Sequence, residues 1–284
     1  MRGALNMNIG INLFGPAKKL YQDFDGTKRK LKEIGFTSIE TCVVFGDENR
    51  LRRNFPPEIM EQMAMMSGGI WHYSDAAAKI AAFRQDGFTI RSSHIMTDTS
   101  TPASFLAVLP AIKAFGQAHQ LKYFVISLMK NLAATQTFVP VLNQYAAELA
   151  EAGIQLAYHN HEVEHINENG TTPLDYLMKN CPSLKLELDV GWAKFAGTSS
   201  LDLMRKYGSR INLLHFKDVR ADASPETRAT CFTAVGAGSI PLREIMALTP
   251  ACQLDDHGLI IDQDDSLGDI LDDLAVGFNN IKNS

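Results

Sequence analysis

The sequence has no long apolar run and no excess of basic residues, and these absences exclude several classes of protein. No stretch approaches the roughly 18 uninterrupted apolar residues of a membrane-spanning helix. Residues 1–15 do not combine a basic patch with a long apolar segment, as a secretory signal would. The 27 basic and 32 acidic side chains give a formal net charge of −5, which argues against nucleic-acid binding by bulk charge. We therefore expect a soluble cytoplasmic protein with no nucleic-acid or membrane partner.

Cysteine is sparse as well. The four cysteines are scattered along the chain and form no Cys-x-x-Cys pair, so they predict reduced, mostly packed thiols and no disulfide framework: Cys42, Cys181, Cys231 and Cys252. The chain is 45% hydrophobic and 21% charged, which is close to the average of globular proteins. A large buried core is therefore possible, and a disordered chain is excluded.

Short apolar runs rich in β-branched and aromatic residues recur between segments of helical periodicity, and there are eight such runs. This alternation predicts a parallel sheet with crossover helices, and eight repeats favour closure into a (β/α)8 TIM barrel. The alternative is an open doubly wound sheet, but the residues after Gly10 lack the Gly-x-Gly-x-x-Gly turn typical of that fold. We predict one TIM-barrel domain over residues 1–284, with strands at Asn8–Leu13, Phe36–Val44, Thr89–His94, Lys122–Ser127, Ile154–His161, Leu184–Val190, Ile211–Phe216 and Leu259–Asp262.

The connections after the second and seventh strands are too long to be plain turns. Phe45 to Tyr73 contains several arginines and a methionine-rich stretch, and Val219 to Gly258 contains a Gly-Ala-Gly turn. Long βα loops of a barrel lie over its carboxyl face, where active sites are found, so a lid or a subunit contact is one interpretation. In the other, the methionines fill an accessory core and the arginines are solvated.

The segment Tyr158–His161 carries the first chemical signal. Alternation along a strand places His159 and His161 on the same side, at the carboxyl end of a predicted barrel strand. Two imidazoles in that position are candidate metal ligands or proton-transfer groups. Residues 161–165 also match His-Glu-x-x-His, but that zinc motif requires a helix, and the polar residues 167–170 that follow would break one. We therefore reject a metalloprotease.

The next three strands also end in ligand-type residues. Asp189 ends the sixth strand just before a Gly-Trp turn, His215 lies near the end of the seventh, and Asp262 ends the eighth. Together with His159 they predict a divalent metal site with mixed nitrogen and oxygen ligands. Asp189 has an alternative role as the cap of the following turn. Asp264 is expected near the start of the last helix, and the acidic run around it lacks the glycine of an EF-hand loop.

These motifs together resemble the xylose isomerase-like superfamily of sugar phosphate isomerases and epimerases, in the subgroup with a Tyr-His-Asn-His motif on the fifth strand. The resemblance covers nearly the whole chain, from residues 9–14 to residues 261–266. It implies a TIM barrel that holds one divalent ion (Mn, Mg, Co or Zn) through Glu, Asp, His and Glu on strands five to eight. The corresponding positions in this chain are His159, Asp189, His215 and Asp262. The chain departs from the pattern at His159 and Asp262, where the superfamily has glutamates.

The resemblance implies a metal-dependent sugar, sugar phosphate or polyol isomerase or epimerase that acts through an enediolate. Because His159 and Asp262 replace two proton-exchanging glutamates, a lyase or dehydratase acting on a keto-sugar or inosose is the alternative, and a non-catalytic sugar-binding barrel is a second. His159 and Asp262 are expected as catalytic residues as well as ligands. Glu40 is expected either to bind a substrate hydroxyl or to pair with a basic neighbour. Further substrate-binding candidates are His94, His161, Trp192 and Lys217. The expected partner is a small sugar, and a homo-oligomer is possible.

Overall fold

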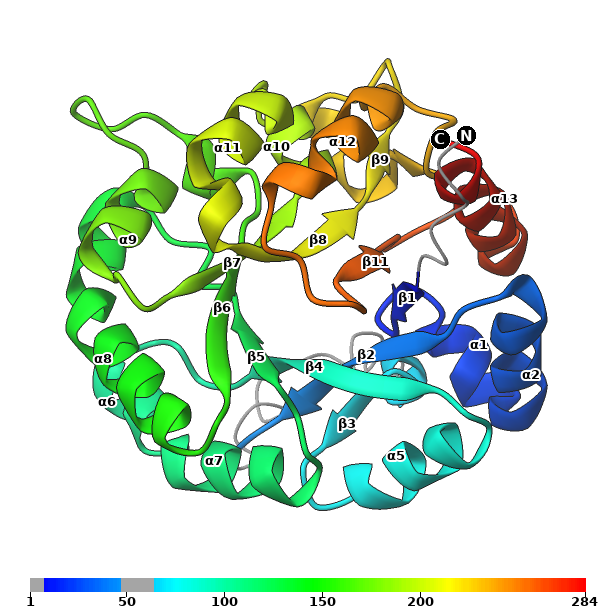
Figure 1. The fold of residues 1–284 in the computed structure, drawn as a ribbon, viewed down its shortest axis with the longest axis horizontal. Coiled ribbons are helices and arrows are strands. Elements are labelled where there is room, and N and C mark those ends of the chain that lie inside the picture. The colour runs from blue at the N-terminus through cyan, green and yellow to red at the C-terminus, as the bar shows by residue number, and fades with distance from the viewer. Residues whose placement is uncertain (1–7, 47–63) are drawn as a thin grey trace.

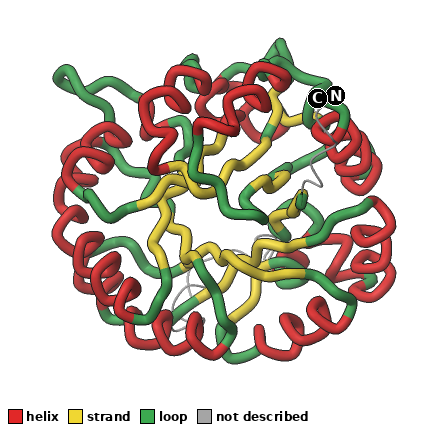
Figure 2. The backbone as a smooth tube through the Cα atoms, viewed as in Figure 1, coloured by secondary structure: helices red, strands yellow, loops and turns green. Residues whose placement is uncertain are grey.

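The computed structural model describes residues 8–46 and 64–284, and these form a closed barrel of parallel strands surrounded by helices (Figures 1 and 2). Strand β1 closes the barrel because it pairs with β2 on one side, at Ile11↔Ile39, and with β11 on the other, at Ile11↔Ile261. The barrel strands are β1 Ile9–Asn12, β2 Ser38–Val44, β4 Thr89–Met96, β5 Tyr123–Ile126, β6 Gln155–His159, β7 Lys185–Asp189, β8 Ile211–Phe216 and β11 Leu259–Ile261. Seven of the predicted runs contain one of these strands and the run Thr89–His94 covers all of β4 but its last two residues, so the predicted (β/α)8 fold is confirmed.

Helices follow the strands around the outside of the barrel (Figure 1). Several begin where the sequence supplies a capping side chain: Asn131 accepts a hydrogen bond from the backbone nitrogen of Ala134, and Thr172 accepts one from that of Asp175. The helices are α1 Ala17–Gln22, α2 Phe24–Ile34, α5 Ala76–Gln85, α6 Pro102–Leu106, α7 Leu109–Ala118, α8 Leu132–Glu151, α9 Pro173–Asn180, α10 Val190–Phe195, α11 Ser200–Tyr207, α12 Leu242–Leu248 and α13 Ile270–Lys282. None of these helices is long and apolar enough to cross a membrane.

Two elements differ from the prediction. Strand β3, Ile70–His72, pairs with the end of β2 outside the eight-strand ring, in a segment too short to show a pattern of its own. The expected Gly-Trp turn after Asp189 is wrong, because Val190–Phe195 forms helix α10. Most of the arginines and methionines of the loop after β2 lie outside the described residues: Arg50, Arg52, Arg53, Met60 and Met63.

The loop after β8 has internal structure. Strand β9, Asp218–Val219, pairs with β10, Phe232–Thr233, to form a short antiparallel ribbon, and the 3₁₀ turn Pro225–Thr230 lies between them. The Asp218 carboxylate accepts hydrogen bonds from the backbone nitrogens of Gly236, Gly238, Ser239 and Ile240, at 2.8–3.1 Å. These contacts anchor the turn that the sequence marked by its two glycines.

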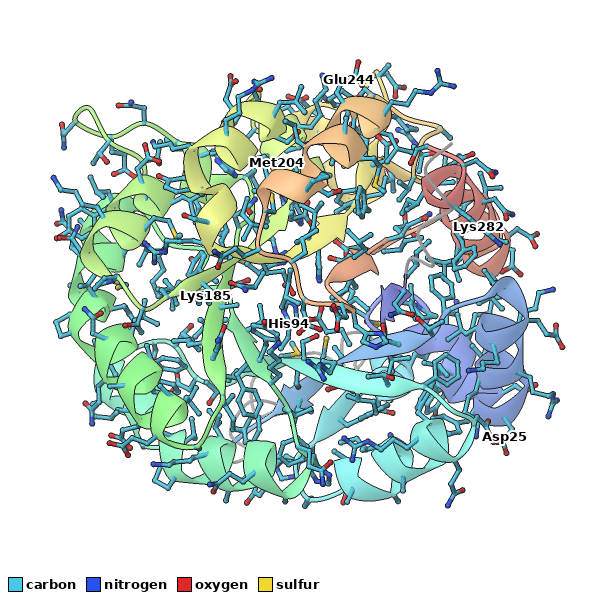
Figure 3. The ribbon with its side chains drawn as sticks, in the orientation of Figure 1. Asp25, His94, Lys185, Met204, Glu244 and Lys282 are labelled. Carbon is cyan, nitrogen blue, oxygen red and sulfur yellow. The ribbon has the colours of Figure 1, made fainter. Side chains whose placement is uncertain are left out.

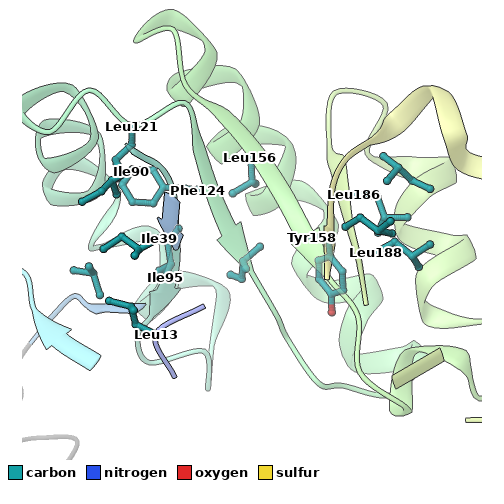
Figure 4. Close-up of a cluster of buried hydrophobic side chains, with 14 of the residues drawn as sticks. Leu13, Ile39, Ile90, Ile95, Leu121, Phe124, Leu156, Tyr158, Leu186 and Leu188 are labelled. Atoms are coloured by element: carbon teal, nitrogen blue, oxygen red, sulfur yellow. The ribbon is translucent and has the colours of Figure 1, made fainter. Parts of the chain in front are cut away.

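The barrel has two apolar regions. A large one lies between the strands and the surrounding helices, and Figure 4 shows part of it, including Leu156, Leu186 and Leu188. A small one fills the inside of the barrel and consists of Tyr123, Val125, Ala157, Leu213 and Ile260. Above this small cluster, the inward-facing positions change from apolar to ionisable. The barrel interior therefore presents its polar groups at the carboxyl ends of the strands.

Candidate metal centre and cavity

Four consecutive strands of the barrel deliver the predicted ligand residues to one place. His159 ends β6, Asp189 ends β7, His215 lies in β8, and Asp262 follows β11 directly. One ligand atom from each of the four lies within 4.8 Å of the others, and all four side chains are buried. The structure therefore brings together the four residues at which the sequence predicted a metal.

One of the two predicted roles of Asp189, that of a cap, is present and uses one of its carboxylate oxygens. Its Oδ1 caps helix α10 by accepting a hydrogen bond from the backbone nitrogen of Trp192 at 2.7 Å, while its Oδ2 has no hydrogen-bond partner. Asn160 holds the Asp189 backbone through two hydrogen bonds, one to its nitrogen at 3.0 Å and one to its carbonyl oxygen at 3.1 Å. The Asp189 carboxylate therefore has a fixed orientation, and one of its oxygens accepts no hydrogen bond.

A cation fits this cluster. Oδ2 of Asp189 and Oδ1 of Asp262 are buried and have no hydrogen-bond partner, and leaving a carboxylate in that state is costly. Burial raises the pKa of Asp189 to about 7, although Lys217 lies 3.9 Å from its Oδ2 and acts in the other direction. Two imidazoles and two carboxylates are a ligand set that divalent ions such as Zn²⁺, Co²⁺ and Mn²⁺ accept.

Lys217 lies beside the cluster and is 1% exposed. Its Nζ lies 2.9 Å from Oδ2 of Asp262 and 2.7 Å from Oδ2 of Asp264. Burial opposes the charge of Asp262, but Lys217 and His215 outweigh it and hold the pKa of that carboxyl below its usual range. Gly191 makes this arrangement possible, because a Cβ there would meet the Lys217 carbonyl oxygen at 2.5 Å.

A cavity of about 370 Å³ opens beside the cluster. His159, Asp262, His161, Lys217 and Asp264 line its polar side. Burial and Lys217 lower the pKa of His161 to about 3, so its ring is neutral, and its Nδ1 has no hydrogen-bond partner. The remaining lining residues come from the strand ends and loops on the other side: Asn12, Phe14, Cys42, His94, Ile95, Met96, Thr97, Thr99, Ser127 and Met129.

A further layer of ionisable side chains lies against the two candidate imidazole ligands. Glu40 is 1% exposed and lies 2.7 Å from His215, and Glu187 is fully buried and lies 2.9 Å from His159. His94, labelled near the middle of the barrel in Figure 3, contacts both carboxylates. Burial lowers the pKa of His94, but Glu187 and Glu40 outweigh it and raise the pKa to about 10.

The remaining sequence candidates take different places. Glu40 pairs with the two histidines and does not line the cavity, which decides between its two expected roles. Trp192 is 3% exposed and packs against Phe195 and Phe232, so it is not a wall of the cavity. Its ring lies between the charged ends of Lys217 and Arg228, at 5.3 and 4.5 Å.

The rejected zinc motif has no metal-binding geometry. Val163–His165 is a 3₁₀ turn, and the ring of His165 contacts Asn160 at 3.0 Å.

Two residues that the sequence did not place in the site belong to it. Glu187 lies two positions before Asp189, on the same face of its strand, and this spacing was the signal that could have found it. Asp264 was expected at a helix start, but α13 begins at Ile270 with Asp269 as its cap, and Asp264 instead binds Lys217.

Comparisons with known proteins agree with this architecture. No family model matches the sequence. A sugar phosphate isomerase/epimerase from Parabacteroides distasonis superposes with a TM-score of 0.68 at 16% identity, over 99% of this chain and 96% of that one. A xylose isomerase-like TIM barrel protein from Mycobacterium smegmatis, solved in complex with magnesium, superposes at 0.61 and 13% identity, over 98% and 95%. The chain has the xylose isomerase-like TIM-barrel fold.

Dehydratases are also among the proteins that this xylose isomerase-like barrel resembles. A probable 3-DHS dehydratase from Bacillus anthracis superposes at a TM-score of 0.66 and 14% identity, over 96% of this chain and 98% of that one. An inosose dehydratase from Geobacillus thermodenitrificans is 30% identical over 117 residues, which are 37% of this chain and 39% of the relative. The match thus spans about two fifths of the length of that curated relative.

Proposed function

We propose that this protein is a divalent-metal-dependent enzyme that isomerises or epimerises a small sugar or polyol through an enediolate. The observation that carries the proposal is the cluster of His159, Asp189, His215 and Asp262, which lies beside a cavity at the carboxyl end of a xylose isomerase-like barrel. The cavity's volume, about 370 Å³, is within the range that holds a small ligand. Solved proteins of this fold include sugar phosphate isomerases/epimerases and a protein with bound magnesium.

The four clustered residues would hold Mn²⁺, Mg²⁺, Co²⁺ or Zn²⁺. A bound divalent ion would supply a Lewis acid that stabilises negative charge on a substrate oxygen. We assign His159 and Asp262 to binding this ion in preference to proton transfer. Nδ1 of His159 already contacts Glu187, and Oδ2 of Asp262 already contacts His215 and Lys217.

We propose Asp264 as the proton acceptor. Its carboxylate lines the cavity, and burial raises the pKa of Asp264, which makes the carboxylate a stronger base. The ammonium of Lys217, 2.7 Å away, holds it in place. In the enediolate route, Asp264 takes the proton from the carbon next to the carbonyl. Returning it to the neighbouring carbon isomerises the sugar, whereas in epimerisation water protonates the opposite face and Asp264 releases its proton to solvent. The neutral ring of His161 accepts a hydrogen bond from a substrate hydroxyl.

Dehydration is the second candidate, because the inosose dehydratases match by sequence and a probable 3-DHS dehydratase matches by fold. The first step is the same: Asp264 takes a proton from the carbon next to the carbonyl. The electron pair of that bond then forms a carbon–carbon double bond. The hydroxyl on the adjoining carbon leaves as water, with the proton that Asp264 has taken.

The test is turnover by the metal-free protein after reloading with each of the four metals. Ketoses, aldoses and inososes are incubated in D₂O, and the products are analysed by NMR and mass spectrometry. An isomerase or epimerase keeps all atoms of its substrate apart from exchanged hydrogen, whereas a dehydratase product lacks one water. We expect Asp264→Asn to retain the metal and lose deuterium incorporation. Binding of a sugar without turnover under any metal would identify the non-catalytic barrel instead, and turnover that survives both EDTA and Asp189→Ala would contradict a metal enzyme.

A further inference from the structure

The two candidate imidazole ligands each have a second ring nitrogen, and both of these nitrogens face buried carboxylates. Nδ1 of His159 lies 2.9 Å from Oε2 of Glu187. Nε2 of His215 lies 2.7 Å from Oε2 of Glu40 and 3.2 Å from Oε1 of Glu187. The opposite nitrogens face the candidate metal ligands: Nε2 of His159 lies 3.8 Å from Oδ2 of Asp189, and Nδ1 of His215 lies 3.1 Å from Oδ2 of Asp262.

The two carboxylates are held in place by a third histidine and an amide. Nε2 of His94 lies 2.9 Å from Oε2 of Glu187 and 3.1 Å from Oε2 of Glu40, so one ring nitrogen links the two acids. Asn12 adds a hydrogen bond to Oε2 of Glu40 at 2.8 Å. These side chains come from β1, β2, β4 and β7, so the layer extends across the barrel.

We propose that Glu187 and Glu40 are positioning residues that determine which nitrogens of His159 and His215 bind the metal. A carboxylate that accepts the N–H of one ring nitrogen fixes the tautomer, leaves the other nitrogen as the ligand, and makes that nitrogen more basic. Glu187 acts on His159 and Glu40 acts on His215, and His94 contacts both acids. This inference rests on the metal site of the proposed function, and it is independent of the reaction carried out there.

A different position for the ion is the competing arrangement. His94, His159, Glu187 and His215 also bring one ligand atom each within 4.8 Å of one another. In that arrangement Glu187 would be a ligand, and the ion would lie on the other side of the two imidazoles. Two residues of each set line the cavity, His94 and His159 in this one and His159 and Asp262 in the other. The set with Asp189 and Asp262 has two buried carboxylate oxygens without a hydrogen-bond partner, against one on Glu187, so we place the ion among His159, Asp189, His215 and Asp262.

The test compares metal affinity in Glu187→Gln with that in a matched control. Asp255→Asn is the control, because its carboxylate is 1% exposed and pairs with Lys122 and Arg91 at the opposite end of the barrel. The Co²⁺ and Zn²⁺ dissociation constants are measured by competition with a chelator, and the visible spectrum of bound Co²⁺ reports the ligand set. We expect Glu187→Gln to weaken metal binding by about 10- to 100-fold with an unchanged Co²⁺ spectrum, and Asp255→Asn to leave the affinity at its wild-type value.

Three results would overturn the proposal. The first is wild-type metal affinity in Glu187→Gln. The second is a Co²⁺ spectrum that changes in Glu187→Gln while Asp189→Ala still holds the ion, because Glu187 is then a ligand. The third is a wild-type protein that takes up no divalent ion. If Glu187→Gln does not fold, Glu40→Gln takes its place with the same expected loss. These variants can also bind metal more weakly while the wild-type protein turns over no sugar. That result supports the positioning role and rejects the proposed reaction.

Discussion

Nζ of Lys217 lies 2.7 Å from Oδ2 of Asp264, although Lys217 follows β8 and Asp264 follows β11. Asp262 shares the same ammonium at 2.9 Å, and Lys217 is 1% exposed. One buried cation therefore serves two carboxylates at the wall of the cavity. This relationship determines how the site responds to the loss of a charge.

Replacing Lys217 by Met removes that cation, which leaves Asp264 without its ion pair and Asp262 with His215 alone. Breaking a buried ion pair from one side costs roughly 3–5 kcal/mol, so we expect the free energy of unfolding to fall by about that amount. Urea unfolding in EDTA measures it. The double variant Lys217→Met/Asp264→Asn should recover part of the loss, and a single variant as stable as the wild type would show that the pair is not needed.

An anionic substrate should bind less well than a neutral one. Among the described residues that line the cavity, the cations are Lys217, which pairs with Asp262 and Asp264, and His94, which pairs with Glu40 and Glu187. Any sugar or keto-polyol that the enzyme turns over should therefore have a lower KM than its phosphate ester. Steady-state kinetics on the two substrates at one ionic strength provide the comparison. A lower KM for the ester would show that a cation is available to it.

The acid sensitivity of the barrel should depend in part on Asp255. Burial would raise the pKa of this carboxyl, but Lys122 and Arg91 outweigh that effect and lower it. A carboxyl with a lowered pKa in the folded state stabilises the fold above its unfolded pKa, about 3.9, and this contribution is lost as the pH falls towards the folded value. The gap in melting temperature between wild type and Asp255→Asn should be largest near neutral pH and narrow below about pH 4. A gap that is unchanged at about pH 3 would argue against the ion pairs as its source.

Removing the Tyr158 hydroxyl, near the site, should lower the free energy of unfolding. The Tyr158 hydroxyl donates to Oε1 of Glu164 at 2.6 Å, and Glu164 is fully buried. In Tyr158→Phe the carboxylate loses a donor, for which we expect a cost of about 1.5–3 kcal/mol, measured by urea unfolding. Tyr207→Phe is the control, because its hydroxyl also donates to a carboxylate, that of Asp175, which is more exposed and keeps Lys206. Equal losses in the two variants would mean that burial of the acceptor does not matter.

The sequence predicted the position of a side chain best where the alternation along a single strand determines that position. Alternation along β6 and β7 places His159 and Asp189 inside the barrel, and the order of the strands places them beside His215 and Asp262. The barrel itself follows from the eight apolar runs. Strand β3 was missed because Ile70–His72 is too short for a period to show, and it exists through its pairing with β2.

The side-chain partnerships across the barrel were not predictable. Glu187 shares its strand face with Asp189, but its contacts are His159, His94 and His215, which belong to three other strands. Asp264 was assigned to a helix start because Asp favours that position. A partner 47 residues away in sequence, Lys217, decides its place instead. Such contacts depend on strand register and loop paths, which local patterns do not encode.

The candidate ligands and the apolar side of the cavity come from different halves of the barrel. β6, β7, β8 and the end of β11 carry the ligands, whereas Ile95 and Met96 on β4 and Met129 after β5 form the opposite side. The apolar positions are therefore separate, in sequence and in the barrel, from the four candidate ligands. Changes at Met96 or Met129 would alter the surface that a substrate meets while the candidate ligands stay in place.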